Sequence, residues 1–361
     1  MKGIAILYQA ILPPVNNGIQ KPMKLGGYAD SGADIAYELQ KNGVLLITPS
    51  QNPKTGNDLD WVFPDTKEGI QLAMDKGAKI FWLNTVLYKN HPIENFFNQN
   101  IEIIGQLPKN VDLYDDKLVT NTLLKYNGLP IPKTDLILKE NQTNYKLTIK
   151  FPLVVKPIRG RGSQGVSRVY NKIELDNKLK KLFAERKYGT SVYVEQYLRG
   201  QEITITVMPP GKYQLNNKTK LIDKYWSLPA VTRFNHKNGI APYNGVVAVI
   251  NNSKVMGDKE LNAEKIKESY QHCEKAAKLI DAKAPIRIDC RANENGDYFL
   301  FDLNMKPNMT GASRSHRKNQ DSLSALAARK IGWYYNDLLL NMIAQKWKPN
   351  YSFSNRSISL S

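Results

Sequence analysis

The chain has 361 residues, 42% hydrophobic and 23% charged, and a formal net charge of +18. This length allows two or three hydrophobic cores, and the charged fraction is that of a folded protein. The 51 lysines and arginines are spread along the chain without a basic arm or a zinc-ligand spacing, which disfavours nucleic-acid binding. No apolar run of about 18 residues is present, so we expect no membrane span. Cys273 and Cys290 are expected to be buried free thiols, which suits the reducing cytoplasm.

The first third of the chain alternates strand and helix patterns. Strands are predicted at 2–8, 44–48, 78–83 and 101–105, and helices at 31–41, 67–76 and 115–126. Strands separated by helices indicate a parallel sheet with crossover helices. We therefore predict an α/β domain over residues 1–114.

The rest of the chain changes to an α+β pattern. Strands are predicted at 151–156, 166–170, 191–196, 202–208, 245–250, 286–291 and 298–303, and helices at 173–186, 260–280, 322–330 and 336–345. Residues 209–243 are rich in Asn, Lys, Pro and Gly with weak periodicity, which predicts a lid or substrate loop without regular structure. We divide this part into domains at 115–208 and 209–347, with a polar tail at 348–361.

Two strands near the C-terminus carry the strongest chemical pattern. Alternation places Arg287, Asp289 and Arg291 on one face of the first strand, and a hairpin would bring Asp302 and Asn304 beside them. Two carboxylates and an amide oxygen are ligands that Mg²⁺ accepts together with substrate phosphates. By spacing alone, a water-exposed charged strand explains the pattern equally well.

A glycine-rich segment comes directly after the strand that ends in Lys156. Glycines at 160, 162 and 165 would let backbone N–H groups approach phosphates, with the lysine as a point charge. A strand comes after the loop, and the P-loop ending is missing, so neither common nucleotide fingerprint applies. Further on, Glu195 and Glu202 could receive an adenine amine and ribose hydroxyls, although solvated acids at a strand connection fit as well.

Taken in order, these features resemble the ATP-grasp superfamily, and most of all D-alanine–D-alanine ligase and related dipeptide (carboxylate–amine) ligases. The resemblance implies an N-terminal parallel-sheet, Rossmann-like domain followed by a two-part ATP-grasp fold. It also implies ATP, two Mg²⁺ ions (which Mn²⁺ could replace), amino-acid or peptide substrates, and a homodimer.

The resemblance assigns roles residue by residue. It places the nucleotide on Lys117, Lys156, Ser163, Glu195, Gln196, Tyr197, Leu198 and Glu202. It makes Asp289, Asp302 and Asn304 the metal ligands and sets Arg287 and Ser163 at the phosphoryl-transfer centre. Lys224 and Tyr225 match a pair that closes over the substrate, and Ser313, with Gly311, matches the site of the acceptor carboxylate.

The chain departs from the family pattern at three places. Asp302 stands where glutamate is usual, and Lys306-Pro307-Asn308 replaces a Ser-Pro-Gly segment. The glutamate that binds the amine of the first amino acid is missing, and Asp30 could substitute for it. These departures concern the substrates more than ATP.

The resemblance implies an ADP-forming ligase that works through an acyl phosphate. Whether it is D-alanine–D-alanine ligase-like, or an L-amino-acid or dipeptide ligase of a biosynthetic or tailoring pathway, stays open. A third hypothesis is a basic nucleotide- or nucleic-acid-binding module without catalysis, which would show steeply salt-dependent binding.

Overall fold

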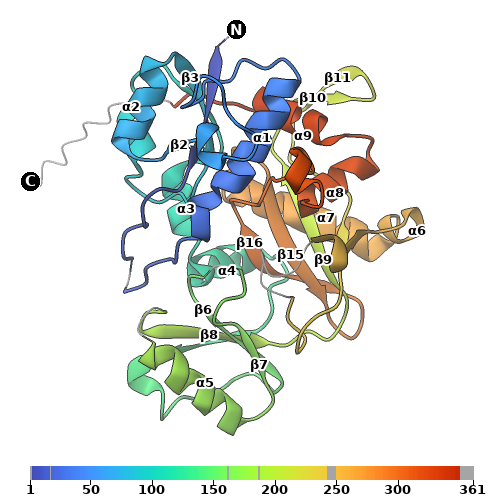
Figure 1. Cartoon of the computed structure of the whole chain (residues 1–361). Coiled ribbons are helices and arrows are strands. Elements are labelled where there is room, and N and C mark those ends of the chain that lie inside the picture. The colour runs from blue at the N-terminus through green and yellow to red at the C-terminus, as the bar shows by residue number, and fades with distance from the viewer. Residues whose placement is uncertain (1, 17, 161, 186–187, 242–248, 350–361) are drawn as a thin grey trace, which may run out of the picture.

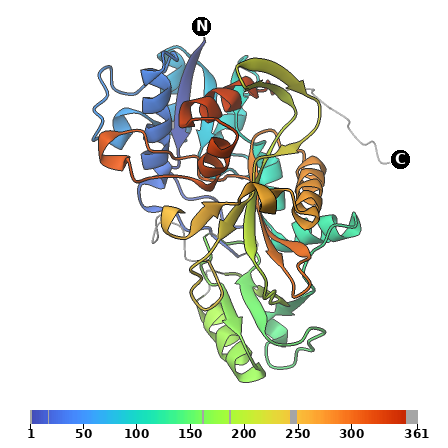
Figure 2. The same cartoon turned by 90° about the vertical axis from the view of Figure 1, so that its right-hand side faces the viewer.

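The computed structural model describes residues 2–16, 18–160, 162–185, 188–241 and 249–349. Figure 1 shows a lower lobe that contains β6, β7, β8 and α5, below a larger upper part that holds the remaining sheets and helices. The same arrangement is seen from the side in Figure 2, where the lower lobe extends away from the rest.

The N-terminal part is built on a parallel four-stranded sheet, as predicted. Its order is β2 (Phe63–Pro64), β1 (Gly3–Tyr8), β3 (Ala78–Asn84) and β4 (Glu102–Ile104). Helix α1 (Ala29–Lys41) packs on the face of Ile4, Ile6 and Trp82, whereas α2 (Lys67–Asp75) packs with Ala5 and Phe81 on the other. The strand predicted at 44–48 is reduced to a single parallel bridge between Leu46 and Ile4.

The lower lobe is an antiparallel four-stranded sheet covered by α5 (Lys172–Ala184). Its order is β5 (Thr134–Leu138), β8 (Ser191–Gln196), β6 (Leu153–Pro157) and β7 (Ser167–Val169). The pairing of β6 with β7 confirms the predicted hairpin around the glycine-rich segment. Leu175, Leu179 and Leu182 of α5 form a separate core with Leu153 and Val155 of β6.

A larger antiparallel sheet occupies the middle of the molecule. It runs β14 (Ser253–Val255), β13 (Val231–Arg233), β9 (Glu202–Met208), β15 (Ile286–Ala292) and β16 (Tyr298–Asn304), with β12 (Trp226–Ser227) on β9. Helix α7 (Glu264–Leu279) covers one face, where Cys273 meets Cys290, and both cysteines are buried free thiols. Because β9 belongs to this sheet, the sheets change at residues 197–201 and not at the predicted boundary after residue 208.

Residues 209–243 were predicted to lack regular structure, and that prediction is wrong for the described residues. They form the hairpin β10 (Gly211–Leu215) and β11 (Lys218–Ile222), followed by β12 and β13. The hairpin escapes prediction because four of the five residues of β11 are exposed and polar residues lie on both of its faces. Of the strand predicted at 245–250, residues 245–248 lie outside the described residues and 249–251 form a 3₁₀ turn.

The helices otherwise agree with the predictions, with shifted ends. Helices α3 (Pro108–Tyr114) and α4 (Lys117–Tyr126) precede the lower lobe, and α3 was not predicted. The helix predicted at 260–280 is divided into α6 (Asp258–Leu261) and α7, because Ala263 has an extended backbone. Helices α8 (Leu323–Lys330) and α9 (Tyr335–Ala344) close the fold, and the predicted tail lies largely outside the described residues.

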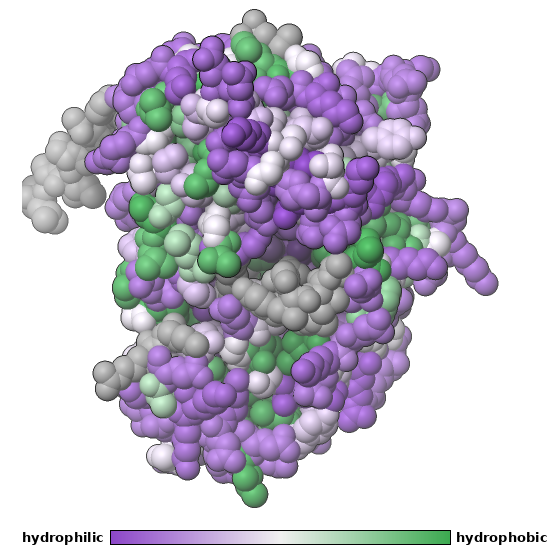
Figure 3. Space-filling view, viewed as in Figure 1, coloured by the Kyte–Doolittle hydropathy of each residue, from purple (hydrophilic) through white to green (hydrophobic). Residues whose placement is uncertain are grey.

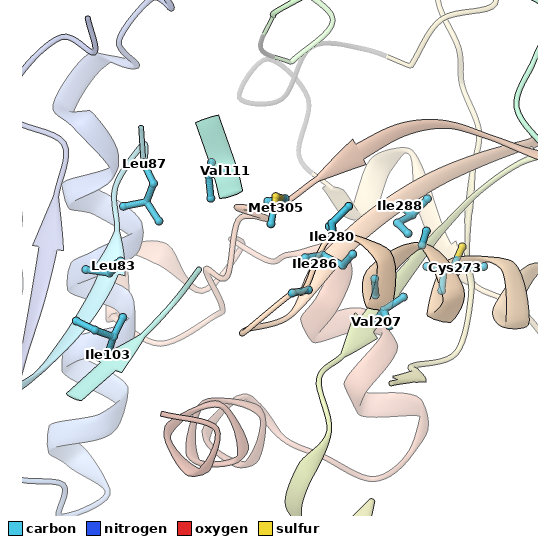
Figure 4. Packing of buried hydrophobic residues seen from close by; sticks show 14 of the residues in the cluster. Leu83, Leu87, Ile103, Val111, Val207, Cys273, Ile280, Ile286, Ile288 and Met305 are labelled. Atoms are coloured by element: carbon cyan, nitrogen blue, oxygen red, sulfur yellow. The ribbon is translucent and has the colours of Figure 1, made fainter. Parts of the chain in front are cut away.

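One hydrophobic core joins the N-terminal part to the larger sheet. Figure 4 shows Met305, the residue directly after β16, between Leu87 and Val111 on one side and Ile280 and Ile286 on the other. The end of β16 is therefore fixed against two parts of the protein.

The surface seen in Figure 3 is mostly hydrophilic, and hydrophobic residues gather at mid-height, where the lower lobe meets the rest. Among the described residues, no helix has both the length and the apolar character needed to cross a membrane.

Candidate functional site

A pocket of about 870 Å³ lies between the sheet of the lower lobe and the larger sheet. Predicted residues from distant segments line it together: Lys117, Lys156, Ser163, Glu195, Gln196, Tyr197, Leu198, Glu202, Asp289 and Asp302. Glycines 160 and 162 line it as well. The sequence order that suggested a nucleotide site thus corresponds to one pocket.

The register of β15 and β16 brings the predicted metal ligands together. Asp289 pairs with Asp302, and Arg287 pairs with Asn304. The register shifts after Asp289, so that Cys290 pairs with Leu300 and Phe301 is the extra residue of a β-bulge. This bulge lets Leu300 turn into the core while Asp302 faces the pocket.

The charged face of β15 is buried, which excludes the exposed-strand interpretation. Arg287 is 7% exposed and Asp289 is 9% exposed. Arg287 Nε donates to Asp289 Oδ1 at 3.3 Å, and Thr204 Oγ1 of β9 donates to the same oxygen at 2.7 Å. A buried charge needs such partners, so the face is built to hold charge away from bulk water.

Lys117 is placed by the start of α4. The Asp116 side chain caps the helix by accepting from Leu118 N at 2.9 Å, which makes Lys117 its first residue. A lysine at a helix N-terminus meets an unfavourable dipole, and the Asp302 carboxylate at 2.9 Å offsets it. Burial by itself lowers the pKa of Lys117, but Asp302 outweighs burial and raises it.

The pKa of Asp302 responds to the same contact in the opposite direction. Burial alone would raise the pKa of this carboxyl, but Lys117 and Lys156 lower it. The pocket therefore presents an ionised carboxylate at neutral pH.

Lys156 forms a second buried ion pair in the pocket. Its Nζ lies 2.7 Å from Glu195 Oε2 and donates to the Phe301 carbonyl at 2.9 Å. The bulge leaves that carbonyl without a strand partner, so it is available to the lysine. Burial raises the pKa of Glu195, against the opposing effect of Lys156. Glu195 is thus a buried partner of a lysine and not a solvated acid at the rim.

The glycine-rich segment turns sharply beside these lysines. Gly162 and Ser163 both have positive φ, at 52° and 63°. Gly165 has φ 75°, and a Cβ there would lie 2.8 Å from Pro157 Cγ. The turn therefore requires glycine at this position, and it holds exposed Ser163 at the pocket lining.

Glu202, the first residue of β9, also lines the pocket. It is 4% exposed, and its Oε2 contacts His236 Nε2 at 2.9 Å and Arg291 Nη1 at 3.5 Å. Sequence reasoning missed His236, because an isolated histidine carries no spacing signal. It could have found Thr204, which lies opposite Asp289 in the polar alternation of β9.

A second pocket of about 940 Å³ adjoins the first and shares with it Lys117, Gly160, Gly162, Phe301 and Asp302. Asn304, Lys306 and Tyr28 line the second pocket but not the first. The Asn304 side-chain oxygen accepts from Lys306 N at 2.9 Å. A ligand in the first pocket and one in the second would meet at Lys117 and Asp302.

Known proteins are similar to this chain in sequence and in fold. A family model described as the D-ala D-ala ligase C-terminus matches residues 123–344, more than half of the chain. The D-alanine–D-alanine ligase of Francisella philomiragia is 24% identical over 249 residues, covering 68% of this chain and 71% of the relative. D-alanine–D-alanine ligase A of Bacillus cereus is 30% identical over 229 residues, covering 62% and 65%. The chain belongs to the D-Ala-D-Ala ligase family.

Solved structures of the family support the fold over nearly the whole chain. The D-alanine–D-alanine ligase of Bacillus anthracis complexed with ATP has a TM-score of 0.63 at 19% identity, covering 95% of this chain and 96% of that one. VanG D-Ala:D-Ser ligase of Enterococcus faecalis has a TM-score of 0.66 at 16% identity, covering 95% and 99%. As a member of this family, the chain is an ATP-dependent ligase that forms an amide bond, and the non-catalytic alternative is set aside.

The structure does not bring Lys224 and Tyr225 to the site. Neither residue lines either pocket. Tyr225 packs against the core under α7, on the face of the sheet opposite Asp289, and donates to the Ala282 carbonyl at 3.1 Å. The segment that does reach the nucleotide pocket from this region is 239–241. The unpredicted β10–β11 hairpin is the reason, because it sets where the next residues lie and spacing along the chain does not reveal it.

The predicted substrate residues also lie away from both pockets. The Asp30 carboxylate is held by Lys24 Nζ at 2.8 Å and by Arg317 Nη2 at 3.3 Å. Gly311 is buried, and a Cβ on it would lie 2.5 Å from the Tyr335 ring. The Ser313 hydroxyl is buried, without a hydrogen-bond partner among the described residues. None of the three therefore lines either of the two pockets.

The candidate metal ligands suit Mg²⁺ by their chemistry. Asp289 and Asp302 supply hard carboxylate oxygens from paired positions, and Asn304 supplies an amide oxygen two residues further on. Within the described part of the chain, no three His, Cys, Asp or Glu side chains gather into a metal site. The candidate site therefore depends on the asparagine and on oxygens that a nucleotide would bring.

Proposed function

We propose that this ligase joins an amino-acid or peptide carboxylate to an amine through an acyl phosphate. The nucleotide occupies the first pocket, and the substrates occupy the second. The shared boundary at Lys117 and Asp302 is where the carboxylate oxygen attacks the γ-phosphorus, ADP leaves, and the amine then displaces phosphate from the acyl carbon.

The buried cations supply most of the chemistry in this proposal. Lys117 and Lys156 face the phosphates, and Arg287 stabilises the charge that spreads over the transferred phosphoryl group. These groups are already buried in ion pairs before the nucleotide arrives, so their charges are in place and exchange partners when the phosphates bind. No side-chain nucleophile is required, since positioning and electrostatics act on the phosphates directly.

Two Mg²⁺ ions complete the proposed site. Asp289, Asp302 and Asn304 would hold them, and the ions would neutralise phosphate charge when bound. Binding would draw the Asp302 carboxylate away from Lys117 and leave that lysine to the phosphates.

The convergence of four separate segments on one pocket is the observation that carries this proposal. Its test is amine-dependent ADP release, measured over a panel of D- and L-amino-acid pairs with Mg²⁺ and ATP. We expect ADP only when a suitable carboxylate and amine are both present. Absence of ADP release with every pair, together with absence of ATP binding, would refute it.

The lining of the second pocket, where the substrates would lie, carries charges of both signs. Its titratable groups include three lysines, Lys21, Lys117 and Lys306, and two acids, Asp115 and Asp302. The acids pair with Lys21 and Lys117, and Lys306 Nζ lies 3.0 Å from the centre of the Tyr28 ring. We propose that Lys306, which lies at the Tyr28 ring in this lining, contacts an anionic group of a substrate.

Growth complementation separates the two substrate assignments. A strain that lacks D-alanyl-D-alanine synthesis should not be rescued by this chain if the alternative is right, and rescue would return the assignment to the cell wall. The homodimer and the cytoplasmic location that the resemblance implies belong to the same proposal. Sedimentation and cell fractionation test them.

A further inference from the structure

Two guanidinium groups from different sheets meet over the ring of Tyr197. The guanidinium carbon of Arg168 lies 4.7 Å from the ring centroid, and that of Arg291 lies 4.8 Å from it. Arg168 belongs to β7 of the lower lobe, and Arg291 belongs to β15 of the larger sheet. Tyr197 lies in the connection between those sheets and lines the nucleotide pocket. The two walls of the pocket therefore meet at one aromatic ring.

Arg291 uses its whole fork of donors at this point. Its Nη2 donates to the Tyr197 hydroxyl at 2.9 Å, its Nε to the Gly200 carbonyl at 3.3 Å, and its Nη1 to the Gly239 carbonyl at 2.6 Å. Gly239 comes from the segment 234–241, which begins after β13 and reaches across to the pocket lining. One side chain thus ties this segment to both the connection and the sheet.

A second contact holds the same segment. His236 Nε2 lies 2.9 Å from Glu202 Oε2, the carboxylate that Arg291 also approaches at 3.5 Å. Gly239 has φ 78°, and a Cβ there would lie 2.5 Å from the Tyr197 hydroxyl and 2.7 Å from Arg168 Nη1. The segment can come this close only because the residue is glycine.

We propose that Arg291 is a positioning residue that pins segment 234–241 over the nucleotide pocket. This inference rests on the proposed function and adds to it the device that keeps the pocket closed. The segment contributes three residues to the lining of the pocket, Gly239, Ile240 and Ala241. Holding it in place therefore keeps water from entering the pocket at this side. When the pin is lost, water attacks the acyl carbon of the acyl phosphate. The bond between the acyl carbon and the bridging oxygen then breaks, and phosphate leaves. The carboxylate is regenerated, and ATP is consumed without amide formation.

Amide hydrogen exchange across 234–241 tests the pin in the intact protein, with and without a non-hydrolysable ATP analogue and Mg²⁺. Arg291→Lys keeps the charge but cannot reach three acceptors at once. Losing hydrogen bonds to a charged donor should speed exchange in this segment roughly ten- to a hundredfold. Arg199→Lys is the matched control, because Arg199 is 62% exposed and pairs at the surface with Glu294. It should exchange as the wild type does.

Gly239→Ala supplies an independent variant that leaves every charge in place. It should speed exchange in 234–241 in the same way and raise the ratio of ADP to amide formed. Unchanged exchange and an unchanged ratio in both Arg291→Lys and Gly239→Ala would overturn the pin. Failure of the proposed function looks different: the wild type would then release no ADP with any amine, while the exchange experiment still reports on Arg291.

Discussion

The proposed nucleotide pocket and the proposed substrate pocket lie side by side, yet their residues were unequally predictable from the sequence. Every residue assigned to the nucleotide lines the first pocket, whereas Asp30, Gly311 and Ser313, assigned to the substrates, line neither. The first pocket is built from strands whose alternation fixes which side chains share a face. The second depends on segments joined by distant ion pairs, such as that between Lys21 and Asp115, which are 94 residues apart. The periodicity of the strands therefore predicts the residues proposed to act on ATP. It does not predict the residues that choose the two substrates.

The largest expected effect is on turnover at the boundary of the two pockets. Asp302→Ala removes a proposed metal ligand and the partner of Lys117, so amine-dependent ADP release should fall by roughly a thousandfold. Asp297→Ala is the control. Asp297 lies in the same β15–β16 hairpin as Asp302, and it forms an exposed ion pair with Lys265 of α7. Circular dichroism should show both variants folded. Surviving activity in Asp302→Ala would show that the metal assignment is wrong.

Sequence alone predicted the parallel sheet, the β6–β7 hairpin and the β15–β16 pair, because each depends on neighbouring strands. It could not predict the bulge at Phe301, which turns Leu300 inward and frees a carbonyl for Lys156. Nor could it reveal that Glu195 is buried against Lys156, since that depends on how the lower lobe folds. Nor could it reveal that Lys224 and Tyr225 line neither pocket, because a hairpin of unrecognised pattern precedes them.

The buried pair in the nucleotide pocket predicts the next largest effect. Lys156→Met leaves Glu195, which is 4% exposed, without its cation and should lower the free energy of unfolding by about 3–5 kcal/mol. A double variant, Lys156→Met with Glu195→Leu, should recover much of that loss without recovering ATP binding. Denaturant unfolding and ATP titration separate the two roles. A double variant as unstable as the single one would mean that Lys156 stabilises the fold through other contacts.

A smaller and more selective effect is expected in the substrate pocket. Lys306→Met keeps the length of the side chain and its packing on Tyr28 but removes the charge, so KM for an anionic substrate should rise roughly tenfold. The affinity for ATP should stay unchanged, because Lys306 does not line the nucleotide pocket. Lys24→Met serves as control, as that lysine pairs with Asp30 outside both pockets. An equal rise in KM for ATP would place Lys306 at the phosphates instead.

The smallest effect tests whether Asp30 has a structural role. Burial would raise the pKa of Asp30, but Lys24 and Arg317 outweigh it and lower the pKa. A carboxyl with a lowered folded-state pKa stabilises the protein above its unfolded pKa of about 3.9, and the stabilisation is lost as the pH falls through the folded value. Asp30→Asn should therefore lower the free energy of unfolding by about 1 kcal/mol at pH 7. The difference should vanish at a pH where the Asp30 carboxyl of the wild type is protonated in both the folded and the unfolded state.

Urea unfolding of the wild type and Asp30→Asn between pH 2 and pH 7 measures this difference directly. If the difference in unfolding free energy disappears as the pH falls, and KM for every amino acid is unchanged, Asp30 has a structural role. Its carboxylate then joins α1 to the loop of Arg317. A raised KM for an amino acid, with no difference in stability, would support the prediction that Asp30 binds the substrate amine. The residues of both pockets would then have been equally predictable from the sequence. The pH dependence decides between these outcomes, because a structural carboxylate stabilises the folded state through its own charge, whether or not substrate is present.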